Sequence, residues 1–180
     1  MIAWDGSPQD IEVWRRVGRE RQKAAIAKGR RDQHGFAGDP ILIHAIGASA
    51  EFVVARVTGK KWHAFADKIK REDGSSIPDV GEDIQVRSTS HPAGRLLVHR
   101  TDRDDETFVL ARTFWPRVEV IGWLWGYEAK EERYWQQPNP RQSPAFFAPN
   151  SVLRSIYSLL DADAPERFRQ EALLAQSKSG

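Results

Sequence analysis

The sequence predicts an α+β (α/β) fold, with a central mixed, largely antiparallel sheet of about 4–5 strands flanked by helices. Two long stretches in the N-terminal third carry apolar residues at helical spacing. The middle of the chain holds short apolar stretches roughly 10–12 residues apart, joined by turn residues, which is typical of a meander of strands. The last part of the chain returns to signals of helix starts.

The composition is typical of a globular protein. The chain has 180 residues, of which 40% are hydrophobic and 29% are charged, and this favours one domain with a sizeable core. Cysteine is absent, which excludes disulfides and thiolate metal sites. No apolar run approaches the roughly 20 residues that span a membrane, and no secretory signal is evident, so we expect a cytoplasmic protein with no membrane partner.

The first predicted helix runs from Ser7-Pro8 to about Lys28, with Ser7 as the N-cap and Pro8 in the first turn. One stripe of this helix is apolar, and the other face is basic; the basic candidates for phosphate contact are Arg15, Arg16, Arg19 and Lys23. A solvated face partly neutralised by Glu12 and Glu20 explains the same pattern equally well. Residues 1–32 are therefore expected to form a basic N-terminal helix or arm.

The second predicted helix covers Ile41–Thr58, and Gly59 ends it as a C-cap glycine. A run of small residues, Gly47–Ala50, comes directly before Glu51 and allows close approach of a neighbouring element. Because a buried unpaired carboxylate is costly, Glu51 should have a metal, an arginine or a backbone donor as its partner. An exposed helical glutamate without a role is the alternative.

Four strands are predicted after a polar loop, at Ile84–Ser88, Arg95–Arg100, Thr107–Phe114 and Val118–Trp125. A hairpin-type connection at His91–Gly94 would join the first two strands, and the whole set would form an antiparallel meander.

The rest of the chain is expected to add shorter elements. Gly126–Trp135 is helical in composition, and Ala145–Ala148 could add a short edge strand. Asn150 or Ser151 can cap a helix that runs to about Leu160, and Asp163–Glu166 looks like the start of a last helix. We therefore expect a core over residues 33–150 and C-terminal helices over residues 151–180 that pack on it.

The stretch Ser76–Thr89 carries the pattern with the clearest chemical meaning. Asp79 follows Pro78 at a turn, and a strand then brings Gln85 and Arg87. Because side chains alternate along a strand, Asp83, Gln85 and Arg87 point one way, and Ile84 and Val86 point the other way. One face of this strand can then belong to the core and the other to a reactive site.

The order of a helical Glu51, a Pro78-Asp79 turn and a Gln85-Val86-Arg87 strand resembles the PD-(D/E)xK nuclease superfamily. The run Gly47–Glu51 is similar to the first helix of its resolvase-like members, and the resemblance covers about residues 43–126. It implies a restriction-endonuclease-like core and a hydrolase: a DNA endonuclease or phosphodiesterase that depends on Mg²⁺ or Mn²⁺.

The resemblance also implies a role for each matching residue. Asp79 would be the central metal ligand, Glu51 an auxiliary ligand, and Val86 would offer its backbone carbonyl. Gln85 stands where the family has an acid, and Arg87 stands where it has lysine. Further candidates are Asp83, which could supply the missing charge, and His91, which could contact DNA beside the basic helix.

Both departures from the family pattern bear on activity. Gln85 brings no negative charge, so metal affinity should fall, and Arg87 can stabilise charge but cannot act as a base. The alternative is a catalytically inactive protein that keeps the nuclease fold and binds nucleic acid or a protein partner. A third hypothesis is a structural protein without a ligand, and a homodimer is compatible with each of the three.

Overall fold

The computed structural model describes residues 1–29, 39–67, 69–72, 75–138, 140, 143–160 and 165–177. These residues form the predicted α+β fold, built on a mixed four-stranded sheet. Its strands are β1 (Ile2–Asp5), β5 (Arg117–Trp125), β4 (Thr107–Phe114) and β2 (Ile84–Thr89), in the spatial order β1-β5-β4-β2. Because β1 pairs with β5, the N-terminal segment contributes a strand to this sheet as well as a helix.

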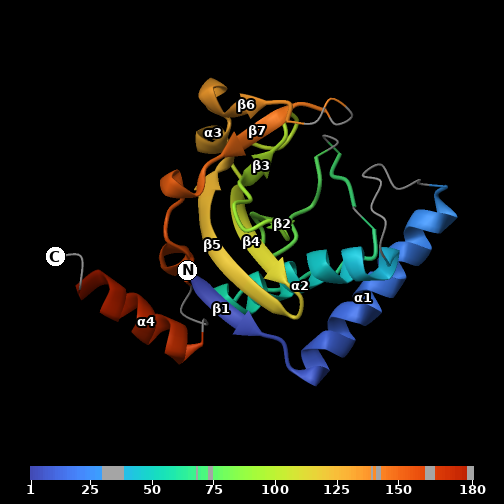
Figure 1. The fold of residues 1–180 in the computed structure, drawn as a ribbon, viewed down its shortest axis with the longest axis horizontal. Helices are drawn as coiled ribbons and strands as arrows, with labels where there is room; N and C mark the ends of the chain where they lie inside the picture. The colour runs from blue at the N-terminus through green and yellow to red at the C-terminus, as the bar shows by residue number, and fades with distance from the viewer. Residues whose placement is uncertain are drawn as a thin grey trace.

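A second, three-stranded antiparallel sheet lies at one end of the first (Figure 1). It has the order β3-β7-β6 and consists of β3 (Leu96–Val98), β7 (Ala145–Ala148) and β6 (Trp135–Gln136). The strand at Ala145–Ala148 was expected at an edge, but it lies in the middle of this sheet.

The predicted meander is wrong in two respects. β4 and β5 pair antiparallel as expected, but β2 runs parallel to β4, and β3 leaves the main sheet to pair with β7. The segment at His91–Gly94 is therefore a crossover to the second sheet and not a hairpin. Leu96 and Val98 of β3 are fully buried in a cluster with Phe108 and Leu110 of β4, and this burial favours the position of β3 in the second sheet.

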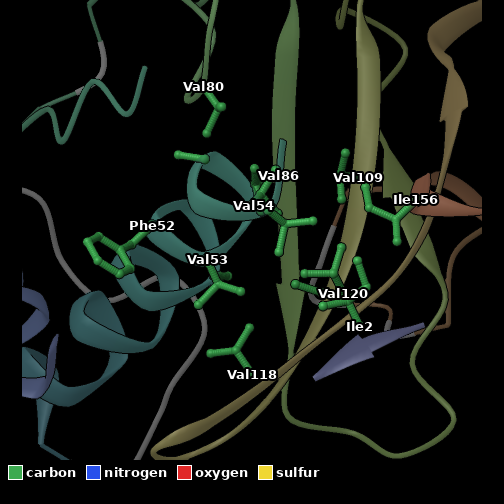
Figure 2. Close-up of a cluster of buried hydrophobic side chains, with 14 of the residues drawn as sticks. Ile2, Phe52, Val53, Val54, Val80, Val86, Val109, Val118, Val120 and Ile156 are labelled. Atoms are coloured by element: carbon green, nitrogen blue, oxygen red, sulfur yellow. The ribbon is translucent and has the colours of Figure 1, made fainter. Parts of the chain in front are cut away.

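The first core lies between α2 (Pro40–Thr58) and the four-stranded sheet. Figure 2 shows Val53 and Val54 of α2 directed toward the strands that carry Val86, Val109 and Val120. By length and hydropathy α2 could cross a membrane, but 61% of its apolar window is buried in the fold, as in the core helix of a folded domain. The helix begins at its N-cap Asp39 and ends at Gly59, which has the expected left-handed conformation (φ 79°).

The opposite face of the sheet carries a second core. Phe108 and Leu110 of β4 and Leu124 of β5 pack there against residues of β3 and β7. β4 is thus buried on both faces, as its nearly continuous apolar sequence requires. The second sheet, rather than a long helix, forms most of the cover on this side.

Helix α1 (Pro8–Ala27) packs on the outside of α2. Its Ser7 capping box is formed with Asp10, as a helix start at this position requires. The two helices approach closely at Gly18, where a Cβ atom would lie 2.7 Å from the carbonyl oxygen of Ile41. This close approach brings the next polar residue on that face, Arg21, over α2.

The C-terminal part differs from the sequence prediction. The expected helix over residues 150–160 is two separate 3-10 turns, Asn150–Val152 and Ile156–Leu159. Between them Arg154 exchanges both backbone hydrogen bonds with Trp123 of β5, and this pairing holds the chain extended.

Two further helical segments are shorter or begin later than the sequence predicts. The helix expected at Gly126–Trp135 is α3 (Gly126–Ala129), followed by a 3-10 turn (Glu132–Tyr134) and β6. The last helix is α4 (Glu166–Ser177); the predicted cap at residue 163 and the tail at 178–180 lie outside the described residues.

Candidate functional site

Glu51 sits inside the fold and is paired with an arginine. It lies on α2 with 8% of its surface exposed. Arg21 of α1 donates to both carboxylate oxygens, at 2.9 Å to Oε1 and 2.6 Å to Oε2. Trp62 adds its indole N–H to Oε2 at 3.1 Å. Among the three partners that the sequence allows for Glu51, the structure therefore has the arginine, supported by an indole donor.

Asp79 lies in the tight hairpin that leads into β2. Its Oδ2 accepts a hydrogen bond from the backbone N–H of Val86 at 2.9 Å. Its backbone carbonyl accepts from the N–H of His63 at 3.2 Å, so both ends of the residue are fixed. The turn itself uses Gly81, whose φ of 59° favours glycine.

The charges of Glu51 and Asp79 act on the same guanidinium. Burial disfavours the charged form of Arg21, but the hydrogen bonds and charge of Glu51, together with the charge of Asp79, outweigh it and raise the pKa of Arg21 above its ordinary value. Residues from α1, α2 and the hairpin before β2 are thus brought together near one half-buried cation. Of the predicted metal ligands, Glu51 and Asp79 belong to this cluster, whereas Val86, expected to offer its carbonyl, contributes its backbone N–H to Asp79.

Gln85 does not join this cluster, because it points to the opposite face of the sheet. Its side chain is 5% exposed and donates from Nε2 to Glu106 Oε2 at 3.1 Å and to the Ser76 carbonyl at 3.4 Å. Glu106 is itself buried, at 4% exposed, and also accepts from Arg71 at 2.6 Å. The face of β2 that was expected to be open for chemistry is therefore packed.

Glu106 is a buried carboxylate that the sequence alone places in an acidic turn. It directly precedes the apolar run of β4, and that position is the signal from which its burial could have been predicted. Because β2 and β4 run parallel and Ile84 pairs with Thr107, the start of β4 lies beside Gln85. Glu106 therefore places an acid next to Gln85. This acid comes from the start of β4, because β2 itself has no acidic residue.

Arg87 is held in a separate ion pair. Its Nη2 donates to Asp102 at 2.7 Å, its Nε donates to the carbonyl of Leu97 at 3.2 Å, and its guanidinium lies over the Phe108 ring at 5.1 Å. Burial alone would raise the pKa of Asp102, but the charge of Arg87 and hydrogen bonds from His99 and Arg87 lower it below the ordinary value. Arg87 thus fastens β2 to the turn before β4.

Asp83 and His91 are held by neighbours of their own. Asp83 is half-buried at the end of the hairpin, with an oxygen 3.6 Å from Lys60 Nζ. His91 is exposed, and its Nδ1 accepts from the N–H of Ala93 at 3.1 Å within the turn after β2. These contacts lie outside the cluster around Arg21, so they do not assign either residue to it.

The basic face of α1 is only half neutralised. Arg19 pairs with Glu12 at 2.8 Å, and Lys23 pairs with Glu20 at 2.9 Å. Arg15 and Arg16 are exposed, and neither forms an ion pair with any residue that the structure describes. Two cations therefore remain available on this helix for an anionic partner.

The cluster around Arg21 contains two carboxylates, the donor type that Mg²⁺ prefers, together with one guanidinium that neutralises part of their charge. Mg²⁺ is commonly bound in proteins by one or two carboxylates, with water completing its shell, and Glu51 and Asp79 supply two. Over the described ranges, no group of three or more His, Cys, Asp or Glu residues comes together. Since Arg21 occupies both oxygens of Glu51, a metal ion and this guanidinium would compete for the same charge.

Comparisons with known proteins leave this geometry to be interpreted by itself. No family model, no curated protein and no solved structure matches the chain.

Proposed function

We propose that the protein is a DNA phosphodiesterase of the PD-(D/E)xK type that depends on Mg²⁺ or Mn²⁺. The observation that carries this proposal is the gathering of Glu51 and Asp79 near Arg21, with the Asp79 carboxylate held by the Val86 N–H. Glu51 and Asp79 come from separate elements, and the resemblance assigns metal binding to both.

Glu51 and Asp79 would hold the cation, and when bound it would polarise a phosphate oxygen and lower the pKa of a water. Arg21, once its bonds to Glu51 are broken, is a cation able to pair with the phosphodiester. Trp62 would keep Glu51 in place through its N–H. The Val86 N–H fixes the orientation of the Asp79 carboxylate.

A second candidate is a nuclease-like protein that binds DNA without cleaving it. Gln85 and Arg87 favour it, because both side chains are engaged away from Asp79, with Glu106 and with Asp102. Such a protein would use Arg15 and Arg16 of α1 and would keep the Arg21 ion pair permanently closed.

Cleavage of plasmid and branched DNA with Mg²⁺ or Mn²⁺ separates the two candidates. The test variant is Asp79→Asn, which preserves an acceptor for the Val86 N–H but removes the charge. The matched control is Asp105→Asn, an exposed aspartate that pairs locally with Arg103. We expect the first change to reduce cleavage by about 10²-fold or more and the second to leave it unchanged.

The other outcomes are equally informative. DNA binding that weakens with salt, without cleavage in any variant, would replace the first candidate by the second. If the protein neither binds nor cleaves DNA, both candidate functions are overturned.

A further inference from the structure

A hollow opens at the C-terminal end of α2, apart from the Arg21 cluster but next to it. It encloses about 340 Å³ and is lined mainly by Phe52, Arg56, Gly59, Lys60, Trp62 and Pro165. Figure 2 shows Phe52 on the side of α2 that faces away from the strands. The size lies within the range of small-molecule sites, which is about 300–1,000 Å³.

Aromatic rings form one part of this lining. Phe52 and Trp62 meet edge to face, with ring centroids 5.4 Å apart, and Trp62 is only half-buried. A flat, partly exposed indole beside a cation is the arrangement on which nucleic-acid bases stack. The hollow can therefore accept a planar ring.

Cations form the other part. Arg56 is exposed, its guanidinium lies over the Phe52 ring at 5.1 Å, and it has no ion pair with another described residue. Lys60 shares the hollow, and its Nζ pairs with Asp83 at 3.6 Å. The two cations lie at a helix C-terminus, where the partial negative charge of the carbonyl groups repels a multivalent anion such as free phosphate. This lining therefore favours a singly charged phosphodiester with a ring attached over free phosphate.

Two contacts link the hollow to the carboxylates. Trp62, which forms one wall, donates its N–H to Glu51, and Lys60 reaches Asp83 on the hairpin that carries Asp79. The hollow therefore adjoins the two carboxylates of the proposed site.

We propose that the hollow binds one nucleotide of the DNA strand, with its phosphate at Arg56 and Lys60 and its base against Trp62. This inference rests on the proposed DNA substrate and adds a pocket that would position the substrate strand.

The test is binding of the thymidine dinucleotide TpT, which carries one phosphodiester and no terminal phosphate, measured by calorimetry in the presence of EDTA. The variant is Arg56→Gln, and the matched control is Arg95→Gln. Arg95 is also exposed and also lies over a phenylalanine, Phe147, at 5.5 Å, but it belongs to the second sheet. We expect Arg56→Gln to weaken dinucleotide binding about tenfold, and Arg95→Gln to leave it within about twofold of wild type.

Equal effects of the two changes would overturn the assignment of the phosphate to Arg56. Inorganic phosphate is the second probe; if it binds as tightly as the dinucleotide, the contact of the base with Trp62 is refuted. Because EDTA removes divalent cations, this assay does not depend on cleavage. A protein that cleaves DNA but shows no Arg56-dependent binding would refute the pocket alone, whereas Arg56-dependent binding without cleavage would refute only the catalytic proposal.

Discussion

The ion pair between Arg21 and Glu51 is the most buried charge pair of the candidate metal cluster. Their side chains are 16% and 11% exposed, so removal of either partner leaves a charge with little water around it. We expect Glu51→Gln to lower the free energy of unfolding by about 3–5 kcal/mol, as measured by urea denaturation. The control, Glu12→Gln, breaks the exposed pair with Arg19 and should cost less than about 1 kcal/mol. Similar losses of stability in both variants would mean that the buried pair contributes no special stability.

Asp102 should make stability depend on acid pH. Its pKa in the folded protein lies below the ordinary value of 3.8, so its ion pair with Arg87 stabilises fully above that value. This contribution is lost as the pH falls through the lowered folded-state pKa. The difference in unfolding free energy between wild type and Asp102→Asn should therefore be large at about pH 6 and shrink toward about pH 2.5. A difference that stays constant over this range in urea titrations would contradict the role of the carboxylate charge.

The sequence predicts the burial of a residue when its neighbours lie on the same element. It does not predict a partner that comes from another element. Apolar neighbours on one helix are enough to predict that Glu51 needs a partner, because burial follows from local periodicity. The identity of that partner depends on how α1 crosses α2, and in the sequence Arg21 is one more basic residue of its helix. Gln85 and Arg87 are assigned to a reactive face for a similar reason, since the cover of that face comes from β3, β7 and the start of β4.

At the scale of elements, the crossing of α1 over α2 depends on Gly18. A Cβ atom there would lie 2.7 Å from the Ile41 carbonyl oxygen and 2.9 Å from the Ala45 nitrogen, which are backbone atoms that cannot rotate away. Gly18→Ala should therefore destabilise the protein by about 1–3 kcal/mol, despite the higher helix propensity of alanine.

Gly47 of α2 is the matched control. A Cβ atom at this position would have Arg21 Nη1 as its nearest neighbour at 3.7 Å, an ordinary van der Waals separation, so Gly47→Ala should stabilise by up to about 1 kcal/mol. Thermal unfolding of the two variants checks the prediction, and opposite signs are expected. A stabilised Gly18→Ala would show that the helices can move apart without cost.

Element boundaries followed from local signals, while pairings did not. The helices at Pro8–Ala27 and Pro40–Thr58 have caps and apolar stripes in their own sequence, and the strands at Thr107–Phe114 and Ile84–Thr89 have short apolar runs. The parallel pairing of β2 with β4 depends on β3 joining β7, about fifty residues later in the chain. The α+β class that the resemblance implies is confirmed by the structure. The endonuclease-like arrangement within that class stays a prediction.

On the scale of the whole molecule, the net charge of +2 is too small to drive DNA binding by itself, so the distribution of charge must do so. Arg15 and Arg16 project from α1 without ion pairs to other described residues, whereas Arg87 and Arg117 of the main sheet are both paired. We expect Arg15→Gln combined with Arg16→Gln to reduce the slope of log K against log salt concentration by roughly two, one for each phosphate that is no longer neutralised. Fluorescence anisotropy with duplex DNA over a series of salt concentrations measures this slope.

Arg133→Gln serves as the control for that experiment, because Arg133 is 66% exposed but pairs with Glu131 at 2.8 Å in the 3-10 turn that follows α3. It should leave the slope unchanged, and none of these surface changes should alter the melting temperature, since no buried interaction is removed. If the control reduces the slope as much as the α1 variant, DNA would be attracted by the overall basic character of the protein. A reduction confined to Arg15 and Arg16 would instead make α1 the element that carries the strand toward Arg21, on another face of the same helix.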